Sequence, residues 1–349
     1  MPHLRLGTRG SPLALWQANM VADALRTAHG WSADAVEIVV IRTTGDKVQD
    51  RALAEIGGKA LWTKELDRAL LAGEIDLAVH SMKDVETIRP AEIVIAANPP
   101  RADVRDKLVG ADSFAALRAT PRIGTSSPRR AAQVRRARPD ADVVLFRGNV
   151  DTRLRKLALG EVDATLLAAA GLDRLGRGDV GAHLSIDTML PAPAQGAVGI
   201  EARADDSATR ALLVAIDHAP TSACVRAERA FLAALTADCH SPVAALAVME
   251  DGAILLRAEI LSEDGAISEA SEARFASGDD LAPRALAEAM LDRAPPALRA
   301  LFASAARPAS RTRRGGDPGA RRRRRRGRGG GATLHDRAGG VDFPRSERP

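Results

Sequence analysis

Three short motifs carry side chains that can do chemistry, and the first of them occurs twice. It reads Gly7-Thr8-Arg9-Gly10-Ser11-Pro12 near the start and Gly124-Thr125-Ser126-Ser127-Pro128 in the middle. In both copies a serine is placed to cap a helix, and a proline stands at the first helical position. The start of a helix presents free N–H groups and partial positive charge to an anion. The two turns therefore predict a cleft for an anionic ligand.

The second motif is Ser81-Met82-Lys83-Asp84, which directly follows an apolar run over residues 75–79 that is typical of a buried strand. Ligands of open α/β sheets bind beyond the carboxyl ends of the strands. In that position Asp84 is suited to act as a general acid and Lys83 to contact an anion. Asp84 is equally suited to a turn or a helix cap, and the motif alone leaves both interpretations open.

Five arginines stand at predicted strand ends or helix starts. A guanidinium group binds a carboxylate with two parallel hydrogen bonds. A single arginine at such a place is usually a solvated surface charge, but five together indicate a ligand with several carboxylates or phosphates. The five are Arg9, Arg129, Arg130, Arg147 and Arg153.

The third motif is Cys239-His240, in a predicted loop between a helix and a strand. A zinc site would need further Cys or His residues at metal-ligand spacing, which are absent, so no metal is expected. A Cys/His nucleophile would require two neighbouring side chains to meet. An inert loop thiol is the third interpretation, and the residues alone do not decide.

The elements that must position these motifs alternate between strands and helices. The second phrase of the repeat is Gly73-Glu74-Ile75-Asp76 in one half and Gly160-Glu161-Val162-Asp163 in the other. The alternation predicts two doubly wound α/β domains with parallel sheets. The expected strands are residues 36–42, 75–79, 122–124, 143–146, 164–167 and 196–201, with a helix over 64–72. Pro99-Pro100-Arg101 and Pro191-Ala192-Pro193 are expected hinges around the inserted second domain.

The last section has a different pattern. A helix is expected over residues 223–236, then strands over 244–249, 253–261 and 267–275, and a helix from about Leu281. Asp251-Gly252 and Asp264-Gly265 are strong hairpin signals, so this section predicts a small α+β domain with a three-stranded antiparallel sheet. The expected domains are residues 1–99 with 196–216, then 100–195, 217–305 and a disordered Arg/Gly-rich tail over 306–349. The polar segment 43–60 is expected to be either a lid or an ordinary surface loop.

Charge and cysteine content limit the class of protein. The chain has 349 residues and a net charge of +5, but residues 307–349 contain fourteen arginines and four acidic residues. Removing that tail leaves a net charge of −5 for residues 1–306. The tail is either a tether to nucleic acid or membrane, or an extension without function. The start of the chain does not resemble a signal peptide, no run is long enough to span a membrane, and two cysteines cannot form a disulfide scaffold, so we expect a cytoplasmic protein.

Taken together, the motifs resemble the porphobilinogen deaminase family, also called hydroxymethylbilane synthase. The resemblance covers residues 4–305 and leaves out the tail. The segments occur in the family's order: GTRGSPLALWQ, GGKALWTKEL, AVHSMKDV, GTSSPRR, LFRGNVDTRL, AGLDRL, PAPAQGAVGIE and the loop that carries Cys239.

The resemblance implies two domains like those of type-2 periplasmic binding proteins, with a third small domain. It implies an enzyme, a transferase of porphyrin and haem biosynthesis, that joins four porphobilinogen molecules head to tail with loss of ammonia. A dipyrromethane cofactor would be linked to Cys239, and Asp84 would be the catalytic carboxylate. Lys59 and Gln195 match positions at a lid or cleft edge. Matches to cofactor- and substrate-binding positions are Arg9, Ser11, Ser81, Lys83, Thr125, Ser127, Arg129, Arg130, Arg147, Gly148, Asn149 and Arg153.

The sequence departs from the family pattern at a few uncharged or loop positions. Glu86 replaces a common Pro, and further departures are Ala60, Val104, Ala194, Ala237 and Asp238. Two other classes remain open. A solute-binding or effector domain would share the fold without needing both Asp84 and Cys239, and a nucleic-acid-binding protein is suggested by the tail alone. We expect a monomer that acts on porphobilinogen, without a nucleic-acid or membrane partner.

Overall fold

The computed structural model describes residues 3–41 and 63–304. These residues belong to a single structural unit that covers residues 1–308. The expected lid over residues 43–60, with Lys59 and Ala60, and the tail over 306–349 lie outside the described residues. No helix in the described part of the chain is both long and apolar enough to cross a membrane.

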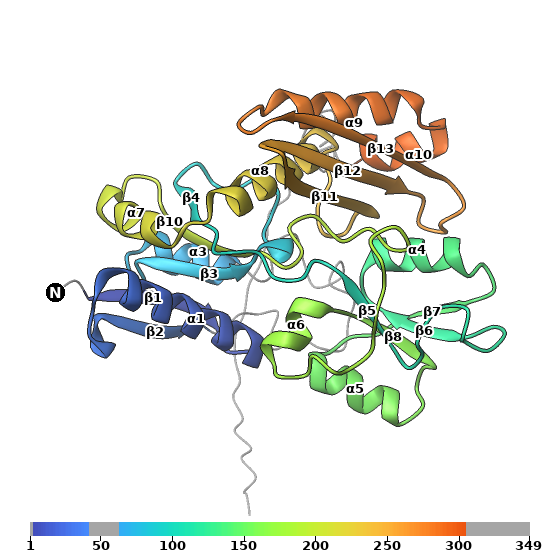
Figure 1. The fold of residues 1–349 in the computed structure, drawn as a ribbon, viewed down its shortest axis with the longest axis horizontal. Coiled ribbons are helices and arrows are strands. Elements are labelled where there is room, and N and C mark those ends of the chain that lie inside the picture. The colour runs from blue at the N-terminus through green and yellow to red at the C-terminus, as the bar shows by residue number, and fades with distance from the viewer. Residues whose placement is uncertain (1–2, 42–62, 305–349) are drawn as a thin grey trace, which may run out of the picture. The chain divides into compact units, whose positions relative to one another are not determined.

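The first sheet contains β1, the first strand of the chain, and has β3 at its centre (Figure 1). Its strand order is β2-β1-β3-β10-β4. Helix α1 packs Val21 and Leu25 against this sheet, together with Leu6 and Ile200. The elements are β1 (Leu4–Arg9), α1 (Pro12–His29), β2 (Val36–Ile41), α3 (Lys64–Leu71), β3 (Leu77–Ser81), β4 (Ile93–Ala97), β10 (Val198–Arg203) and α7 (Ser207–Leu213).

The second sheet has the corresponding order, β7-β6-β8-β5-β9. In each sheet the strand that carries the Gly-Thr pair lies between the two strands that follow it in sequence: β1 lies between β2 and β3, and β6 lies between β7 and β8. The elements are β5 (Asp106–Val109), β6 (Arg122–Thr125), α4 (Pro128–Ala137), β7 (Asp142–Leu145), α5 (Val150–Ala158), β8 (Ala164–Ala168), α6 (Ala169–Arg174) and β9 (Ala182–His183).

Two expectations about these sheets were wrong in detail. Neither sheet is purely parallel, because β10 runs antiparallel to β3 and β4, and β5 runs antiparallel to β8 and β9. The strand expected over 75–79 begins at Leu77 and continues to Ser81. Residues 73–76 form a turn instead, in which Asp76 accepts two hydrogen bonds from the Arg5 side chain, of 3.1 and 2.7 Å.

The structure confirms the duplicated turn. Ser11 accepts a hydrogen bond from Ala14 N at 3.3 Å, and Ser127 accepts one from Arg130 N at 3.4 Å, so each caps its helix. The glycine of each Gly-Thr pair allows a side chain to pack on the strand. A Cβ on Gly124 would lie 2.5 Å from the Phe146 ring.

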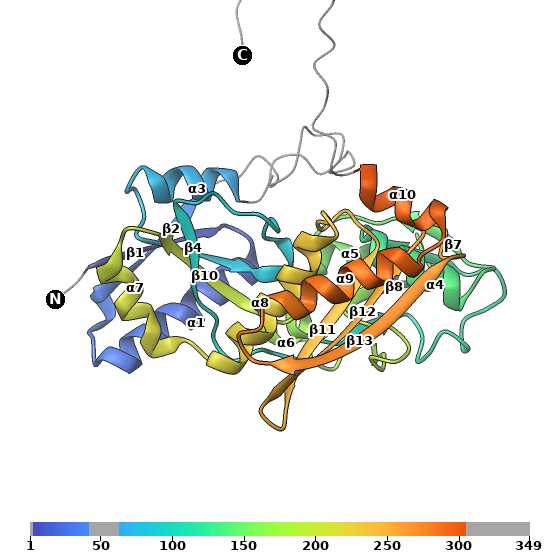
Figure 2. The same ribbon diagram turned by 90° about the horizontal axis from the view of Figure 1, so that it is seen from above.

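The third part is a three-stranded antiparallel sheet with helices on one face, as expected (Figure 2). Asp251 and Gly252 both have positive φ, 49° and 78°, which is the signature of a type I′ hairpin turn. Phe231, Leu256 and Met290 are fully buried in its core. The elements are α8 (Ala219–Ala234), β11 (Val243–Glu250), β12 (Ala253–Leu261), β13 (Ser268–Ala276), α9 (Leu281–Arg293) and α10 (Pro296–Ser304).

One buried ion pair connects this third part to both of the segments that were expected to be hinges. Arg101, in the first hinge, donates to the two oxygens of Glu228 on α8 at 2.7 and 3.1 Å. Glu228 also accepts hydrogen bonds from Ala194 N, beside the second hinge, and from Ala247 N in β11. All these donors satisfy a carboxylate that has no solvent exposure, as a buried charge requires. The domain boundaries given above remain a prediction.

Candidate active site

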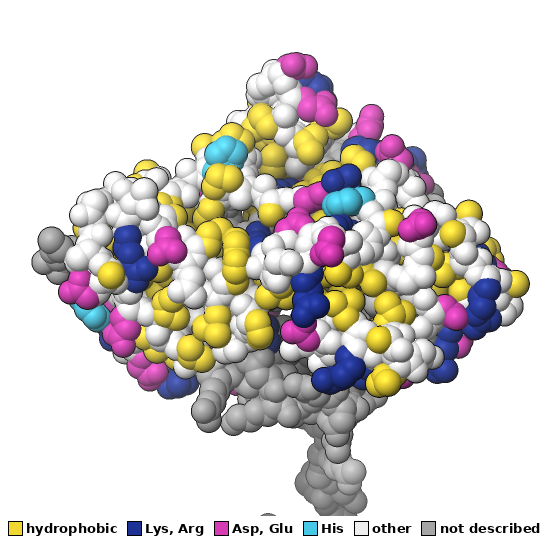
Figure 3. All heavy atoms as spheres, turned by 60° about the horizontal axis from the view of Figure 1, so that its bottom comes forward, with side chains coloured by type: hydrophobic (Ala, Val, Ile, Leu, Met, Phe, Trp, Pro, Cys, Tyr) yellow, Lys and Arg dark blue, Asp and Glu magenta, His cyan; other side chains and the backbone are white. Residues whose placement is uncertain are grey.

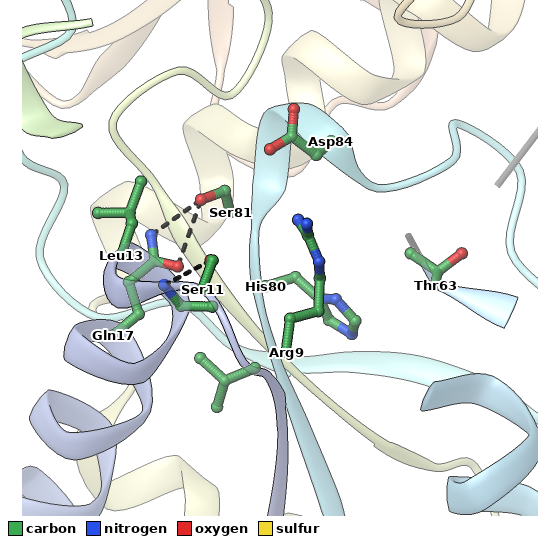
Figure 4. A pocket seen from close by; sticks show the side chains of 10 residues that line it. Arg9, Ser11, Leu13, Gln17, Thr63, His80, Ser81 and Asp84 are labelled. Atoms are coloured by element: carbon green, nitrogen blue, oxygen red, sulfur yellow. Dashed lines mark hydrogen bonds between the residues drawn. The ribbon is translucent and has the colours of Figure 1, made fainter. Parts of the chain in front are cut away.

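A pocket opens where β1 and β3 end, and four of the expected site residues line it (Figure 4). Arg9 is the last residue of β1, Ser11 caps α1, and Ser81 ends β3. Asp84 closes the short 3-10 helix that follows β3. The Arg9 side chain extends toward Asp84 in this pocket.

Two further pocket residues were missed by the sequence reasoning. Gln17, one turn into α1, donates to Ser81 Oγ at 2.9 Å and is almost fully buried. His80 Nε2 lies 3.1 Å from Glu201 Oε2 on the neighbouring strand β10. His80 lies inside the strand next to the recognised motif, but its partner comes from a strand far along the chain. Only the sheet register reveals that pairing.

The side chains of Asp84 and Lys83 form no hydrogen bond or salt bridge within the described part of the chain. Asp84 is exposed, and its carboxylate accepts no hydrogen bond from those residues. Its interpretation as a cap is therefore not supported. Lys83 is half-buried, and its amine makes no hydrogen bond to the described residues. Burial and the nearby Arg130 lower the pKa of Lys83 to about 8, against the opposing effect of Asp84.

The two arginines that open α4 do not point freely into a cleft. Arg129 Nη1 donates to Asp106 Oδ2 at 2.8 Å, and Arg130 Nη2 donates to Asp106 Oδ1 at 2.6 Å. Asp106 is completely buried at the start of β5, and the charges of the two guanidinium groups hold its pKa well below the usual range. Sequence reasoning missed Asp106, since a single aspartate before a short apolar run gives no signal. The five-arginine cluster thus loses two members to an internal carboxylate.

Arg147 and Arg153 are different, because neither has a carboxylate partner among the described residues. Arg147 Nη1 is buried and makes no hydrogen bond to them. Arg153 donates to Gly148 O at 2.9 Å and to Ser126 Oγ at 3.0 Å, both neutral acceptors. Burial, together with Arg130 and Arg147, lowers the pKa of Arg153 to about 10. These positive charges are not neutralised by the described protein around them.

The remaining expected positions in the second unit serve as supports. Asn149 caps α5 by accepting from Thr152 N at 2.9 Å. Gly148 has a φ of 122°, and a Cβ there would lie 2.6 Å from Thr152. Thr125 is buried and accepts a hydrogen bond from Ser127 N.

Gln195 is not at a cleft edge, contrary to expectation. It is 1% exposed, and its amide donates to Val104 O at 2.8 Å and to Asp106 Oδ1 at 2.9 Å. Because a buried carboxylate must be satisfied by hydrogen-bond donors, the interior position of Gln195 is explained by its hydrogen bond to Asp106.

The two cysteines lie in opposite environments. Cys224 is 5% exposed in the core between α8 and the third sheet, where burial raises the pKa of its thiol to about 11. Cys239 is exposed on its loop. Desolvation by the protein around this loop, followed by the charges of Asp84 and Asp238, raises the pKa of Cys239 to about 12. The charge of the Asp84 carboxylate therefore acts on the thiol, although their motifs are far apart in sequence.

Known protein families decide the identity of this arrangement. Residues 4–211 match the family model described as porphobilinogen deaminase, dipyromethane cofactor binding domain, and residues 222–292 match the model of the porphobilinogen deaminase C-terminal domain. This chain belongs to the porphobilinogen deaminase family.

Curated members of the family are similar over nearly their whole length. The porphobilinogen deaminase of Sphingopyxis alaskensis is 59% identical over 307 residues, covering 86% of this chain and 97% of that protein. The porphobilinogen deaminase of Paracoccus denitrificans is 52% identical over 297 residues, covering 84% and 95%.

Solved structures of periplasmic proteins are more distant. A periplasmic substrate-binding protein from Coxiella burnetii has a TM-score of 0.38 at 14% identity, covering 61% of this chain and 91% of its own. The L-cystine solute receptor of Neisseria gonorrhoeae has a TM-score of 0.35 at 17% identity, covering 62% and 85%. These scores are too low to carry an argument.

Two departures from the family pattern have a visible structural setting. Ala194 adopts a φ of 60°, a conformation that glycine enters without strain, which accounts for glycine being frequent there. Glu86 places its carboxylate 3.2 Å from Arg89 Nη1, so its charge is paired. Nothing in the structure explains the choice of Val104.

Proposed function

We propose that this chain is a hydroxymethylbilane synthase with Asp84 as its catalytic group. One observation carries the proposal. The carboxylate of Asp84 accepts no hydrogen bond from the described residues, and its charge acts on Cys239, Lys83 and Arg153 alike. An exposed carboxylate thus acts electrostatically both on an exposed thiol and on cations that no described carboxylate neutralises.

The proposed reaction joins four porphobilinogen molecules and one water into hydroxymethylbilane and four molecules of ammonia. Each addition breaks the bond from the aminomethyl carbon to nitrogen and forms a carbon–carbon bond to the free α-carbon of the next pyrrole. The leaving nitrogen takes up a proton, and the α-carbon of the attacking pyrrole releases one after the new bond has formed. Asp84 serves both needs, as the acid that donates to the departing amine and as the base that accepts the proton afterwards.

The charge of Asp84 has a second use. Loss of ammonia leaves positive charge on the pyrrole, and a nearby carboxylate stabilises it as it develops. The exposed position of Asp84 at the end of a 3-10 helix lets successive rings approach it. We assign substrate binding to Arg9, Ser11 and Ser81 in the pocket, and to Lys83, Arg147 and Arg153 on the cationic side.

The residues present fit the dipyrromethane cofactor of the family. The cofactor carries several carboxylates. One donor among the described residues, the buried Arg147 Nη1, has no protein acceptor there and requires such a partner. When bound, the cofactor supplies the pyrrole α-carbon from which the chain is extended. We propose Cys239 as its attachment point, because Cys224 is enclosed in a hydrophobic core. Thr125, Ser127, Gly148 and Asn149 hold the shape of the surrounding turns, and Arg129 and Arg130 support them through Asp106.

We propose that residues 1–306 act in the cytoplasm as a monomer, without a nucleic-acid partner. Their net charge is negative, and on the face drawn in Figure 3 the acidic and basic side chains are interspersed. Nucleic-acid binding depends on concentrated positive charge. Removing the residues after Arg307 should leave turnover unchanged.

The purified chain, incubated with porphobilinogen, tests the proposal. We expect ammonia and hydroxymethylbilane in a ratio of four to one, and an intact mass that exceeds the sequence mass by one dipyrromethane. A chain that binds porphobilinogen without releasing ammonia would instead be a solute-binding protein of the same fold.

A further inference from the structure

The segment that follows Asp84 is held by the third part of the molecule and not only by its own sheet. Arg229, on α8, donates hydrogen bonds to three successive backbone carbonyls. Nη1 reaches Val85 O at 3.4 Å, and Nη2 reaches Glu86 O at 2.6 Å and Thr87 O at 3.0 Å. Val85 also packs with Val225, one turn earlier on α8, in a small apolar cluster.

The same segment touches the loop that carries Cys239. Thr87 Oγ1 donates to Ala237 O at 2.8 Å. Asp84 immediately precedes residues 85–87, and Cys239 follows Ala237 by two positions. A short strap, residues 85–87, therefore connects the segment of the catalytic carboxylate to the thiol-bearing loop through the hydrogen bond from Thr87 to Ala237.

Arg229 is unusual in what it binds. Within the described residues it makes no salt bridge to a carboxylate, and its guanidinium group is satisfied by neutral carbonyl groups. Burial lowers the pKa of Arg229 to about 10. Burying a charged group without an opposite charge costs free energy. The planar guanidinium group can bind adjacent carbonyls at the same time, which the ammonium group of a lysine cannot do.

We infer that Arg229 and Thr87 are positioning residues that fix Asp84 relative to Cys239. The inference rests on the proposed function, since it assigns value to the spacing of those two groups. Reactions that transfer protons between positioned groups are sensitive to displacement, and a shift of about 1 Å can cost about 10²-fold in rate. The strap spans two parts of the fold, so the spacing is set by side-chain contacts and not by chain connectivity.

The test compares Arg229→Met, Arg229→Lys, Thr87→Val and Thr87→Ser with a matched control, Arg226→Met. Arg226 lies on the same helix, is exposed, and makes no hydrogen bond to the described residues. Each purified holoenzyme is measured for cofactor content by intact mass, for melting temperature, for kcat and KM with porphobilinogen, and for amide hydrogen exchange over residues 82–89 and 236–241.

We expect Arg229→Met to lower kcat about tenfold or more, with faster exchange in both segments and little change in KM. Arg229→Lys should recover only part of the loss. Thr87→Val should accelerate exchange over 236–241 and lower kcat, and Thr87→Ser should restore both because it keeps the hydroxyl.

The inference is overturned if Thr87→Val behaves like Thr87→Ser, or if Arg229→Met loses activity only in proportion to its folded fraction. If Arg229→Met does not fold, the Thr87 pair and Arg229→Lys decide by the same criteria. Failure of the wild type and of Arg226→Met to release ammonia would count against the proposed function instead.

Discussion

Arg130 grips a single oxygen of Asp106 with two nitrogens, Nε at 3.2 Å and Nη2 at 2.6 Å. The pair is buried, with Arg130 at 6% exposure and Asp106 at zero. The two guanidinium nitrogens that would bind a ligand carboxylate are therefore already bonded to Asp106. Arg130 is thus committed to the protein, whereas Arg147 keeps a buried donor that has no acceptor among the described residues.

The same substitution should therefore act differently at these two arginines. Arg130→Lys removes charge-assisted hydrogen bonds from a buried carboxylate and should lower the free energy of unfolding by about 1–3 kcal/mol. Arg147→Lys should leave the melting temperature unchanged and lower kcat/KM about 10–100-fold, because its buried donor is kept for the ligand. Thermal melts and steady-state kinetics on both variants separate the effects. Equal loss of stability in the two would show that Arg147 is structural.

Asp84→Asn should abolish turnover without harming the fold. Removing general acid–base catalysis costs about 10²–10⁴ in rate, and losing the stabilising negative charge adds to this. Since the carboxylate accepts no hydrogen bond from the described residues, the melting temperature should stay the same. A loss of about 0.5–2 kcal/mol in stability with near-normal turnover, as for a helix cap, would remove Asp84 from the mechanism.

Cys239→Ser should be inactive and lack the added mass of a dipyrromethane, whereas Cys224→Ser should keep both the mass and most of its activity. Cys239 is exposed on its loop, and Cys224 lies in a closed core. Peptide mapping of the wild type should locate the adduct on the peptide that contains Cys239. Active enzyme with an unmodified Cys239 would contradict the assignment.

Lys83 should titrate near pH 8 when no ligand neutralises its surroundings. The appropriate protein is Cys239→Ser, which cannot attach the cofactor. The rate of amine acetylation at Lys83 should rise with a midpoint of about 8, the value to which burial and Arg130 lower its pKa. Because the folded state holds this proton less tightly than the unfolded chain does, stability should increase as pH rises from about 8 toward about 10.4.

Replacing Asp84 by Asn in the same background gives the control. Asp84 raises the pKa of Lys83, so its neutralisation should move the acetylation midpoint further down. A midpoint near the ordinary lysine value of about 10.4 would show that Lys83 is well solvated.

Local signals in the sequence were sufficient for most of the elements. Ser11 and Ser127 before proline marked two helix starts, and Asp251-Gly252 marked a hairpin, because capping and turn chemistry depend on neighbouring residues only. The antiparallel course of β5 and β10 was not foreseen, since strand direction is settled by packing between distant segments. Several elements were not expected at all, because they carry no clear boundary signal: β4, β5, β9, α5, α6, α7 and α10.

The site shows the same division. Family motifs gave Arg9, Ser81 and Asp84, which the structure brings into one pocket. The partners of Arg129 and Arg130 could not be inferred, because Asp106 reaches them only through the register of β5 beside β8. Arg129 and Arg130 looked like ligand-binding groups because their shared counter-charge, Asp106, was hidden in the sequence.

The order of the strands also bears on whether the two halves can exist apart. Strand β5 directly follows the four-strand series of the first half but completes the second sheet, and β10 follows the second half but completes the first. β10 lies between β3 and β4, so a fragment ending before it would leave a gap inside its own sheet, not a loose edge. The five strands of the second sheet, in contrast, follow one another along the chain. A protein cut into two pieces within this insert would therefore rebuild its first sheet only when both pieces came together.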